Sequence, residues 1–585
     1  MTRYVALLAL IIMACGATST ALSTIDPSTV SPPLETPSAS TPITSPTPAS
    51  TIAPPATFTP TPDPSPTPTL ASDPRVAADD VQLFPWPLYA GDRLSVDVDP
   101  FLPEWPVGAG GEEARVTLTV GSGRAFTSTV AAMGLDGAPQ ARFHWVTDLS
   151  TVPQTTVFTV TLDLPAEIPD ADPANNTTVF SVAVHPLEDL PPPEPFARWV
   201  VTETVGFRLH YLDNSAAERD LPAILTEARA AYSDVAARLG STEERVDIYL
   251  LDRVVGQGGY ASGEWVAVTY TDRRYSPVAL SSVLRHELTH SLDGVVGCDG
   301  APTLLREGFA VYMAGGHYRR EPLRERGAAL VATTHYLPLS ELVEDFYTHQ
   351  HEISYLEAGS LVQFIADRYG QDGITDACRA ASVSEGNDHV RLEAAVGALG
   401  YEGIPAFERA WHVWLEGADV RSYDQVLLDL EFRLMDAMRA YQASYDPPAH
   451  FLEGILFSPA EAERQGIVAD FVRRPREAEP VGLELVLAMA QEALEQRDPL
   501  MLEILVEDVE AALARRAGET DFVEEAVEIT AAALEENWEP YRILLEFDER
   551  YLVYALDRQQ WPQQSALTAE VRDGVWTLEE VQWDR

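Results

Sequence analysis

Short runs in which apolar and polar residues alternate fill the chain between about residues 81 and 186. RLSVDV, ARFHWV and TTVFSVAV place every second side chain on one face, which is the period of a half-buried β-strand. Clusters of glycine, proline and aspartate separate these runs. This pattern is typical of an antiparallel β-sandwich, and we predict one over residues 76–190.

Beyond the proline-rich stretch PLEDLPPPEP the pattern changes from strands to helices. RWVVTETVGFRLHYL, VDIYLL and GGYASGEWVAVTY are strand-like, with one helix expected at 216–239, whereas helical periodicity extends from Pro277 to about residue 415. Strands followed by helices predict an α+β domain over residues 197–420. The chain is therefore expected to be a multidomain protein.

The last third of the chain is patterned as helices followed by a small sheet. We predict a helical region over residues 421–515 and an α+β domain over residues 516–585, with a helix before four strands. Asp573 and Gly574 form a hairpin signal between the last two strands. Helices followed by an antiparallel sheet resemble an NTF2-like cone at the level of pattern.

The first 75 residues follow neither period. MTRYVALLALIIMAC has an early cation, a short apolar run and then a cysteine, and the run is too short to cross a bilayer as a helix. Residues 1–18 resemble a bacterial lipoprotein signal, in which Cys15 would carry the lipid anchor. Met13 is unusual at its position, so an ordinary cleaved export signal stays open. Residues 19–75 are nearly all Ser, Thr, Pro and Ala, which predicts a disordered linker.

The net charge limits which partners the protein can bind, and the cysteines bear on whether it contains a disulfide. The formal net charge of −50 over 585 residues repels phosphate backbones, which excludes nucleic acid as an expected partner. Solubility or adaptation to habitat would also account for this charge. Apart from Cys15 the chain has Cys298 and Cys378, and an oxidising compartment would permit a bridge between them. Two unpaired thiols are the alternative.

The segment SSVLRHELTHSLDG carries the clearest chemistry. His286 and His290 are four residues apart, so on a helix both imidazoles face the same point and can bind one metal ion. Glu287 lies about 100° round the helix, where it can act as a base without binding the metal. The alternative is a surface helix with two incidental histidines.

Glu307 follows His290 by 17 residues, within TLLREGFAVYMAGG. This Glu, followed by Gly308 and apolar residues, resembles the second helix of gluzincin metallopeptidases, whose carboxylate is the third zinc ligand. The resemblance to peptidase-MA-like gluzincins covers about residues 199–415 and implies Zn²⁺ held by His286, His290 and Glu307. Gly308 and Ala310 are expected to let this helix approach the first one closely. An exposed helical carboxylate is the alternative role for Glu307.

EISYLEAGSLVQFIADRYG resembles the helix of M1-type aminopeptidases that carries a tyrosine before two small residues. The resemblance places the group that stabilises the oxyanion on Tyr355, with Tyr312, His317 and Tyr318 as alternatives. Val311 stands where many gluzincins have an aspartate that orients a histidine ligand, so Asp293 or Asp299 is expected to replace it.

The amine-binding Gly-x-Met-Glu-Asn segment of aminopeptidases is missing, and GGYASGEWV stands in its place. This difference favours an endopeptidase that binds peptide along a strand edge. Glu264 is an alternative anchor for a substrate amine.

DADPANNTTVFSVAV is similar to the last hairpin of CARDB-type immunoglobulin-like modules, with its turn at Asn175 and Asn176. The resemblance implies a spacer or a module that binds a surface protein. Together these features predict a zinc-dependent peptidase that is anchored to the outer face of the cell membrane and hydrolyses peptide bonds with a zinc-activated water. Two alternatives are a lipid-tethered binding protein with a silent zinc-peptidase fold and a structural surface protein whose metal only stabilises it.

Overall fold

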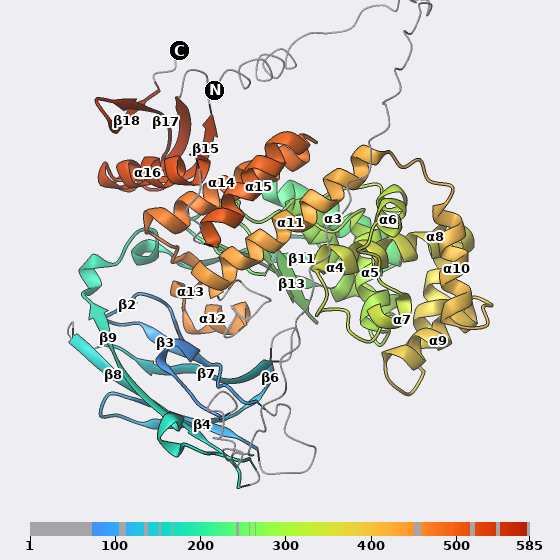
Figure 1. Ribbon diagram of the computed structural model, residues 1–585, viewed down its shortest axis with the longest axis horizontal. Coiled ribbons are helices and arrows are strands. Elements are labelled where there is room, and N and C mark those ends of the chain that lie inside the picture. Colours follow the sequence, from blue (N-terminus) through green and yellow to red (C-terminus); the bar gives the residue numbers. More distant parts are fainter. Residues whose placement is uncertain are drawn as a thin grey trace, which may run out of the picture. The chain divides into compact units, whose positions relative to one another are not determined.

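The structure is a computed structural model that describes most of the chain after residue 72 (Figure 1). The described residues are 73–103, 113–133, 138–150, 154–166, 168–241, 245–256, 258–263, 265–447, 449, 458–514, 521–545 and 550–581. The expected signal with Cys15, nearly all of the linker, and Glu264 lie outside them. Within these ranges, no helix has the length and apolar character needed to cross a membrane.

The predicted β-sandwich consists of two sheets that pack face to face. One sheet has the order β1 (Val81–Phe84), β3 (Arg93–Val98), β7 (Ala138–Asp148) and β6 (Ala131–Met133). The other has the order β2 (Leu88–Tyr89), β9 (Thr177–His185), β8 (Gln154–Asp163), β4 (Arg115–Val120) and β5 (Ala125–Thr129). The alternating apolar residues of both sheets, among them Val96, Leu118 and Phe158, form one buried core.

After the sandwich comes a mixed sheet with the order β10 (Trp199–Glu203), β11 (Phe207–Leu212), β12 (Val246–Leu251), β14 (Trp265–Thr269) and β13 (Gly259–Ser262). Strands β11, β12 and β14 are parallel. Helices α2 (Ala216–Arg219) and α3 (Leu221–Leu239) provide the crossover from β11 to β12, and the connection from β12 to β14 runs through β13. Strand β13 pairs antiparallel with β14 and forms one edge of the sheet.

Both faces of this mixed sheet are covered, which is why its central strands β12 and β14 are mostly apolar. Ile248, Leu250 and Val268 face the main core of the protein. Tyr249 and Leu251, which alternate with them, pack instead against the short helices α12 (Pro459–Gln465) and α13 (Ala469–Val472). A segment from the last third of the chain thus covers the outer face of a sheet built near the middle.

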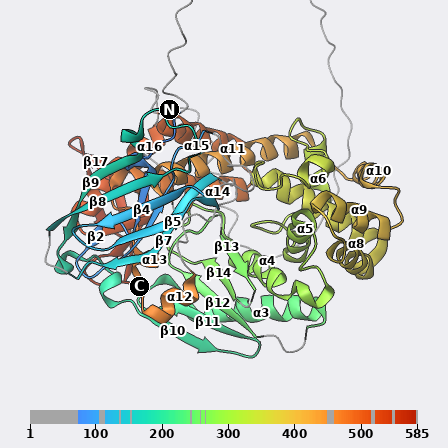
Figure 2. The ribbon, with the colours of Figure 1, turned by 90° about the horizontal axis from the view of Figure 1, so that it is seen from below.

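Helices follow the sheet, as the sequence predicts. They are α4 (Leu280–Leu292), α5 (Thr303–Ala314), α6 (Leu323–Val331), α7 (Leu339–Leu342), α8 (His351–Ser382), α9 (Asp388–Ala398) and α10 (Ile404–Leu415). Helix α4 packs on β13 and β14, and α5 lies between α4 and α8 (Figure 2). A disulfide between Cys298 and Cys378 joins the loop after α4 to α8.

One expectation about these helices is wrong. Gly308 was expected to bring α5 close to α4, but a Cβ added there would lie 2.4 Å from the carbonyl oxygen of Ala358 on α8. A Cβ on Gly359 of α8 would in turn lie 2.3 Å from Cγ1 of Val311. The small residues therefore serve the contact between α5 and α8, because helix backbones can approach so closely only where a side chain is absent.

The last third of the chain continues the main core. It comprises α11 (Ser422–Tyr445), α14 (Ala478–Glu495), α15 (Pro499–Leu513), α16 (Asp521–Glu535) and the antiparallel strands β15 (Trp538–Leu545), β16 (Tyr551–Asp557), β17 (Gln564–Arg572) and β18 (Val575–Glu580). Helices α14 and α16 pack on each other and on β15. Asp573 and Gly574, with φ of 54° and 81°, form the expected turn between β17 and β18.

Arg473, just after α13, links the β-sandwich to this region. Its guanidinium donates to Asp92 at 2.7 and 2.8 Å and to Glu194 at 2.6 and 2.7 Å. All three side chains are buried, with exposed fractions of 6%, 8% and 7%. If one charge is removed from a buried cluster of ion pairs, the remaining charges lose their partner in an interior that solvates charge poorly.

We expect Arg473→Met to lower the free energy of unfolding by about 3–5 kcal/mol, because Asp92 and Glu194 would lose their buried cation. Urea denaturation measures this change. The matched control is Arg572→Met, which removes an exposed guanidinium paired with Glu570 and Glu579 and should leave the stability unchanged. Equal effects of the two substitutions would contradict the role given to Arg473.

Candidate metal centre

Helix α4 presents His286, Glu287 and His290 towards one cavity. Leu284, Leu288 and Leu292, on the other side of the helix, are fully buried and seat it in the core as expected. His286 and Glu287 are themselves buried, with exposed fractions of 6% and 7%. The helix therefore holds its polar face in a fixed position through packing on the opposite face.

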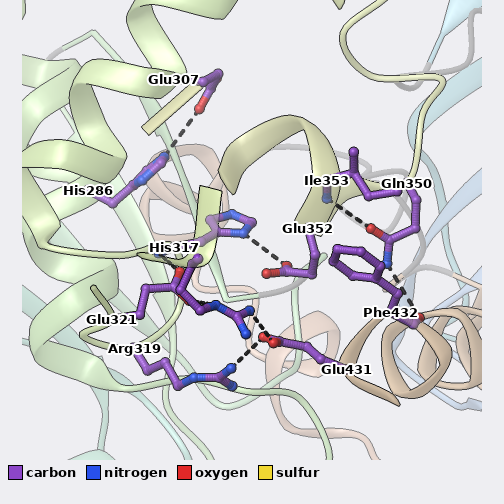
Figure 3. Close-up of polar contacts among 11 residues, drawn as sticks. His286, Glu307, His317, Arg319, Glu321, Gln350, Glu352, Ile353, Glu431 and Phe432 are labelled. Atoms are coloured by element: carbon purple, nitrogen blue, oxygen red, sulfur yellow. Dashed lines mark hydrogen bonds and ion pairs between the residues drawn. The ribbon is translucent and has the colours of Figure 1, made fainter. Parts of the chain in front are cut away.

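Glu307 on α5 completes a group of three donor atoms. Its Oε2 lies 3.2 Å from Nε2 of His286 and 3.2 Å from Nε2 of His290, and the two Nε2 atoms are 3.1 Å apart. Donors placed 2.0–2.1 Å from one tetrahedral ion stand about 3.3 Å apart. The three side chains therefore fit a single metal ion, and they can hold one. Figure 3 shows His286 and Glu307 directed at each other.

Electrostatics in the group are those of a site that attracts a cation. Burial lowers the pKa of His286 to about 4, despite its hydrogen bond to Glu307. Burial also acts against a charged His290, but the negative charge of Glu307 outweighs it and raises the pKa of His290. The pKa of Glu307 lies well below its usual range, because the two histidines outweigh the effect of its burial. A proton on His290 thus provides positive charge that a metal ion would replace.

Glu287 differs from Glu307 although the two are equally buried. Burial raises the pKa of Glu287 to about 8, and the charge of His290 only partly opposes this effect. Glu287 lines the cavity without belonging to the group of three donors. Glu287 thus lies beside the donor group without being part of it.

Tyr347 is a site residue that the sequence analysis missed. It follows the short helix α7, and its hydroxyl donates to Oε1 of Glu307 at 2.8 Å. The hydrogen bond occupies the carboxylate oxygen that does not face the histidines and so fixes the orientation of the carboxylate. A tyrosine in an irregular segment has no periodicity that would have singled it out.

The expected aspartate support for the histidines is not in place. Asp293 accepts a hydrogen bond from Nε of Arg306 at 3.1 Å. Among the described residues, neither Asp293 nor Asp299 hydrogen-bonds to His286 or His290, and Nδ1 of His286 is buried without a hydrogen-bond partner. Val311, at the position of the family's aspartate, packs against Gly359 instead. In the described structure, the support that reaches the donor group comes through Glu307.

The donor group opens onto a cavity of about 250 Å³. Tyr355, His317 and Tyr318 all line it, whereas Tyr312 does not and instead lies under the guanidinium of Arg238. The ring of Tyr355 stacks on His317 with 3.9 Å between centroids and lies 6.0 Å from the ring of His286. Burial raises the pKa of Tyr355 well above its usual range, so the hydroxyl stays protonated and can donate.

His317 is held by a carboxylate. Its Nδ1 lies 3.0 Å from Oε1 of Glu352, and both side chains are buried (Figure 3). A carboxylate at Nδ1 fixes the ring and leaves Nε2 for other partners. Of the residues the sequence offered beside Tyr355, His317 therefore has the best-defined geometry.

Strand β13 forms another wall of the cavity, as expected for GGYASGEWV. Gly259, Tyr260 and Ala261 line it, and the strand packs against α4. A Cβ added to Gly259 would lie 2.9 Å from Val283 and 3.2 Å from Glu287, so glycine is needed for the strand to lie this close to the helix. The hydroxyl of Tyr260 is buried there without a hydrogen-bond partner in the described structure.

Comparison with known proteins adds no assignment. No family model matches the chain, and no curated protein matches it either.

We expect Tyr347→Phe to weaken metal binding by about tenfold or more, because Glu307 would lose the hydrogen bond that orients its carboxylate. Competition with a chelator of known affinity measures the change. Tyr312→Phe is the matched control, because that tyrosine lies outside the cavity and should leave the affinity unchanged. Equal affinities of the Tyr347→Phe protein and the unaltered protein would contradict the role of Tyr347.

Proposed function

We propose that the chain is a zinc metallopeptidase of the gluzincin type that hydrolyses peptide bonds within its substrate. The observation that carries the proposal is the convergence of His286, His290 and Glu307, with Glu287 beside them in one cavity. Two imidazoles and one carboxylate, with a position left open, are a ligand set of catalytic zinc sites. The resemblance of residues 199–415 to gluzincins agrees with this assignment.

Zinc bound by the three side chains would supply Lewis acidity towards the scissile carbonyl and lower the pKa of water. Burial alone would keep the carboxyl group of Glu287 protonated near neutral pH, and the positive charge of a bound zinc ion would favour its ionised form. As a carboxylate, Glu287 takes a proton from the water that attacks the carbonyl carbon and returns it to the leaving nitrogen. The C–N bond then breaks, and the products are an acid and an amine. Burial of Glu287 in the cavity keeps its carboxyl group away from competing solvent.

Tyr355 is proposed to stabilise the oxyanion that forms during attack. Its protonated hydroxyl lines the same cavity as Glu287, and its ring is fixed by stacking on His317. A preorganised donor at this point gains strength because the cavity is partly shielded from water. Strand β13 is proposed to bind the peptide backbone through its open edge.

We further propose that the enzyme acts outside the cytoplasm, attached to the membrane through lipid on Cys15. The signal-like start of the sequence and the Ser/Thr/Pro-rich segment support this location. The disulfide between Cys298 and Cys378 supports it independently, because disulfides persist in oxidising compartments. The β-sandwich is proposed to act as a spacer or to bind a surface protein.

We expect Glu287→Gln to retain one zinc ion per chain and to lower kcat/KM for peptide hydrolysis by about 10³-fold, because the proton acceptor is lost. Elemental analysis and a peptide-library cleavage assay measure the two effects. Glu344→Gln, at an exposed carboxylate outside the cavity, is the control and should keep full activity. Full hydrolysis by the Glu287→Gln protein would sink the proposed mechanism.

We expect Tyr355→Phe to lower kcat by about 10²-fold while KM changes little, because the hydroxyl acts on the transition state. Steady-state kinetics on one cleaved peptide measures both constants. His317→Gln tests the neighbouring donor in the same assay. If His317→Gln lowers kcat by this amount and Tyr355→Phe does not, the oxyanion role belongs to His317.

A further inference from the structure

Helix α11 brings a cation into the cavity from outside the region that resembles a peptidase. Arg439 on this helix has an exposed fraction of only 8% and lines the same cavity as His286 and Glu307. One turn further on, Gln442 donates to the carbonyl oxygen of Gly256 at 2.9 Å. This hydrogen bond holds α11 against the cavity wall and so fixes the point of the backbone from which the side chain of Arg439 extends.

Burial outweighs the neighbouring negative groups at Arg439, unlike at the buried Arg326 and Arg474. Burial lowers the pKa of Arg439 in spite of Glu352, Asp436 and the hydroxyls of Tyr318 and Tyr355, which all act in the opposite direction. In contrast, carboxylates outweigh burial at Arg326 and Arg474 and raise their pKa values. The cavity thus contains a buried cation whose surroundings favour the arrival of another negative charge.

The carboxylates that act on Arg439 also have other partners. Glu352 accepts from His317 at 3.0 Å, and Asp436 accepts a hydrogen bond from Gln350. The other arginine of the cavity, Arg306, donates its Nε to Asp293, and its side chain is 35% exposed. Arg439 is therefore the more deeply buried of these two arginines, and it lines the cavity beside Tyr355.

We propose that Arg439 binds a carboxylate of the substrate, so that peptides with a carboxylate near the scissile bond are the preferred substrates. The inference rests on the proposed peptidase function of the same cavity. A guanidinium pairs with a carboxylate through two parallel hydrogen bonds, which gives both affinity and orientation. With a net charge of −50, the protein as a whole repels acidic peptides, so their selection requires a local cation such as this one.

Binding to the Glu287→Gln protein loaded with zinc tests the proposal without turnover. Three fluorescent peptides of one sequence are compared: the free acid, the C-terminal amide, and the amide with glutamate as its last residue. We expect the free acid or the glutamate peptide to bind about tenfold more tightly than the plain amide. Tighter binding of the free acid would show that the site takes a C-terminal carboxylate. Tighter binding of the glutamate peptide would show that it takes a side-chain carboxylate.

Substitution of the arginines then assigns the carboxylate. Arg439→Met should abolish the difference between acid and amide, and Arg439→Lys should keep part of it, because lysine retains the charge without the planar fork. Arg306→Met should keep the full difference. Equal binding of the three peptides, binding of none, or a preference lost in Arg306→Met instead would overturn the proposal.

The same peptides separate this inference from the proposed function. If the unaltered protein cleaves all three at equal rates, the carboxylate preference fails and the peptidase assignment stands. If the binding preference is present and depends on Arg439 but no peptide is cleaved, the peptidase assignment fails and the carboxylate site stands. Thermal denaturation of each variant shows that the fold is retained.

Discussion

The position of Glu307 depends on how closely α5 packs against α8. Gly308, the residue after Glu307, leaves room for the carbonyl oxygen of Ala358, and any side chain there would collide with backbone. Gly359 on α8 makes the reciprocal opening for Val311. Because neither glycine position has room for a side chain, the two helices can pack this closely only with glycine at both positions. The two histidines lie on one helix, so the helical period alone brings them together. The third donor, Glu307, reaches them only because α5 packs closely on α8.

Which residues come together in the cavity could be predicted from the sequence where they follow a local period. His286, Glu287 and His290 lie on one helical turn, and Tyr355 heads a helix whose pattern is recognisable. The alternating runs likewise predicted strands such as β3, β7 and β9, and Asp573-Gly574 predicted the last hairpin, because these features depend on neighbouring residues. The strand edge at GGYASGEWV was predicted only through the family resemblance, and the order of the strands was not predicted.

The residues that sequence reasoning missed depend on contacts between distant segments. Tyr347 lies in an irregular stretch, and its partner Glu307 is 40 residues away. Arg439 lies on a regular amphipathic helix that seemed to belong to another region, and nothing in its period shows that it enters the cavity. Gly308 was recognised as a packing residue, but its partner helix was wrongly identified, because small residues show that a close contact exists without showing what makes it. The acidic composition similarly gave no sign of the arginines buried at the junctions between segments.

The disulfide closes a loop of the chain that carries several residues of the site. Cys298 and Cys378 are 80 residues apart, and the loop between them carries Glu307, Tyr347 and Tyr355 but neither histidine. Cys298, where this loop begins, follows His290 by only eight residues. When α5 and α8 separate from α4 during a local opening, the bond keeps both ends of the loop beside the histidines, which raises the effective concentration of the third donor there. A metal ion held by the two imidazoles would then still have Glu307 close to it.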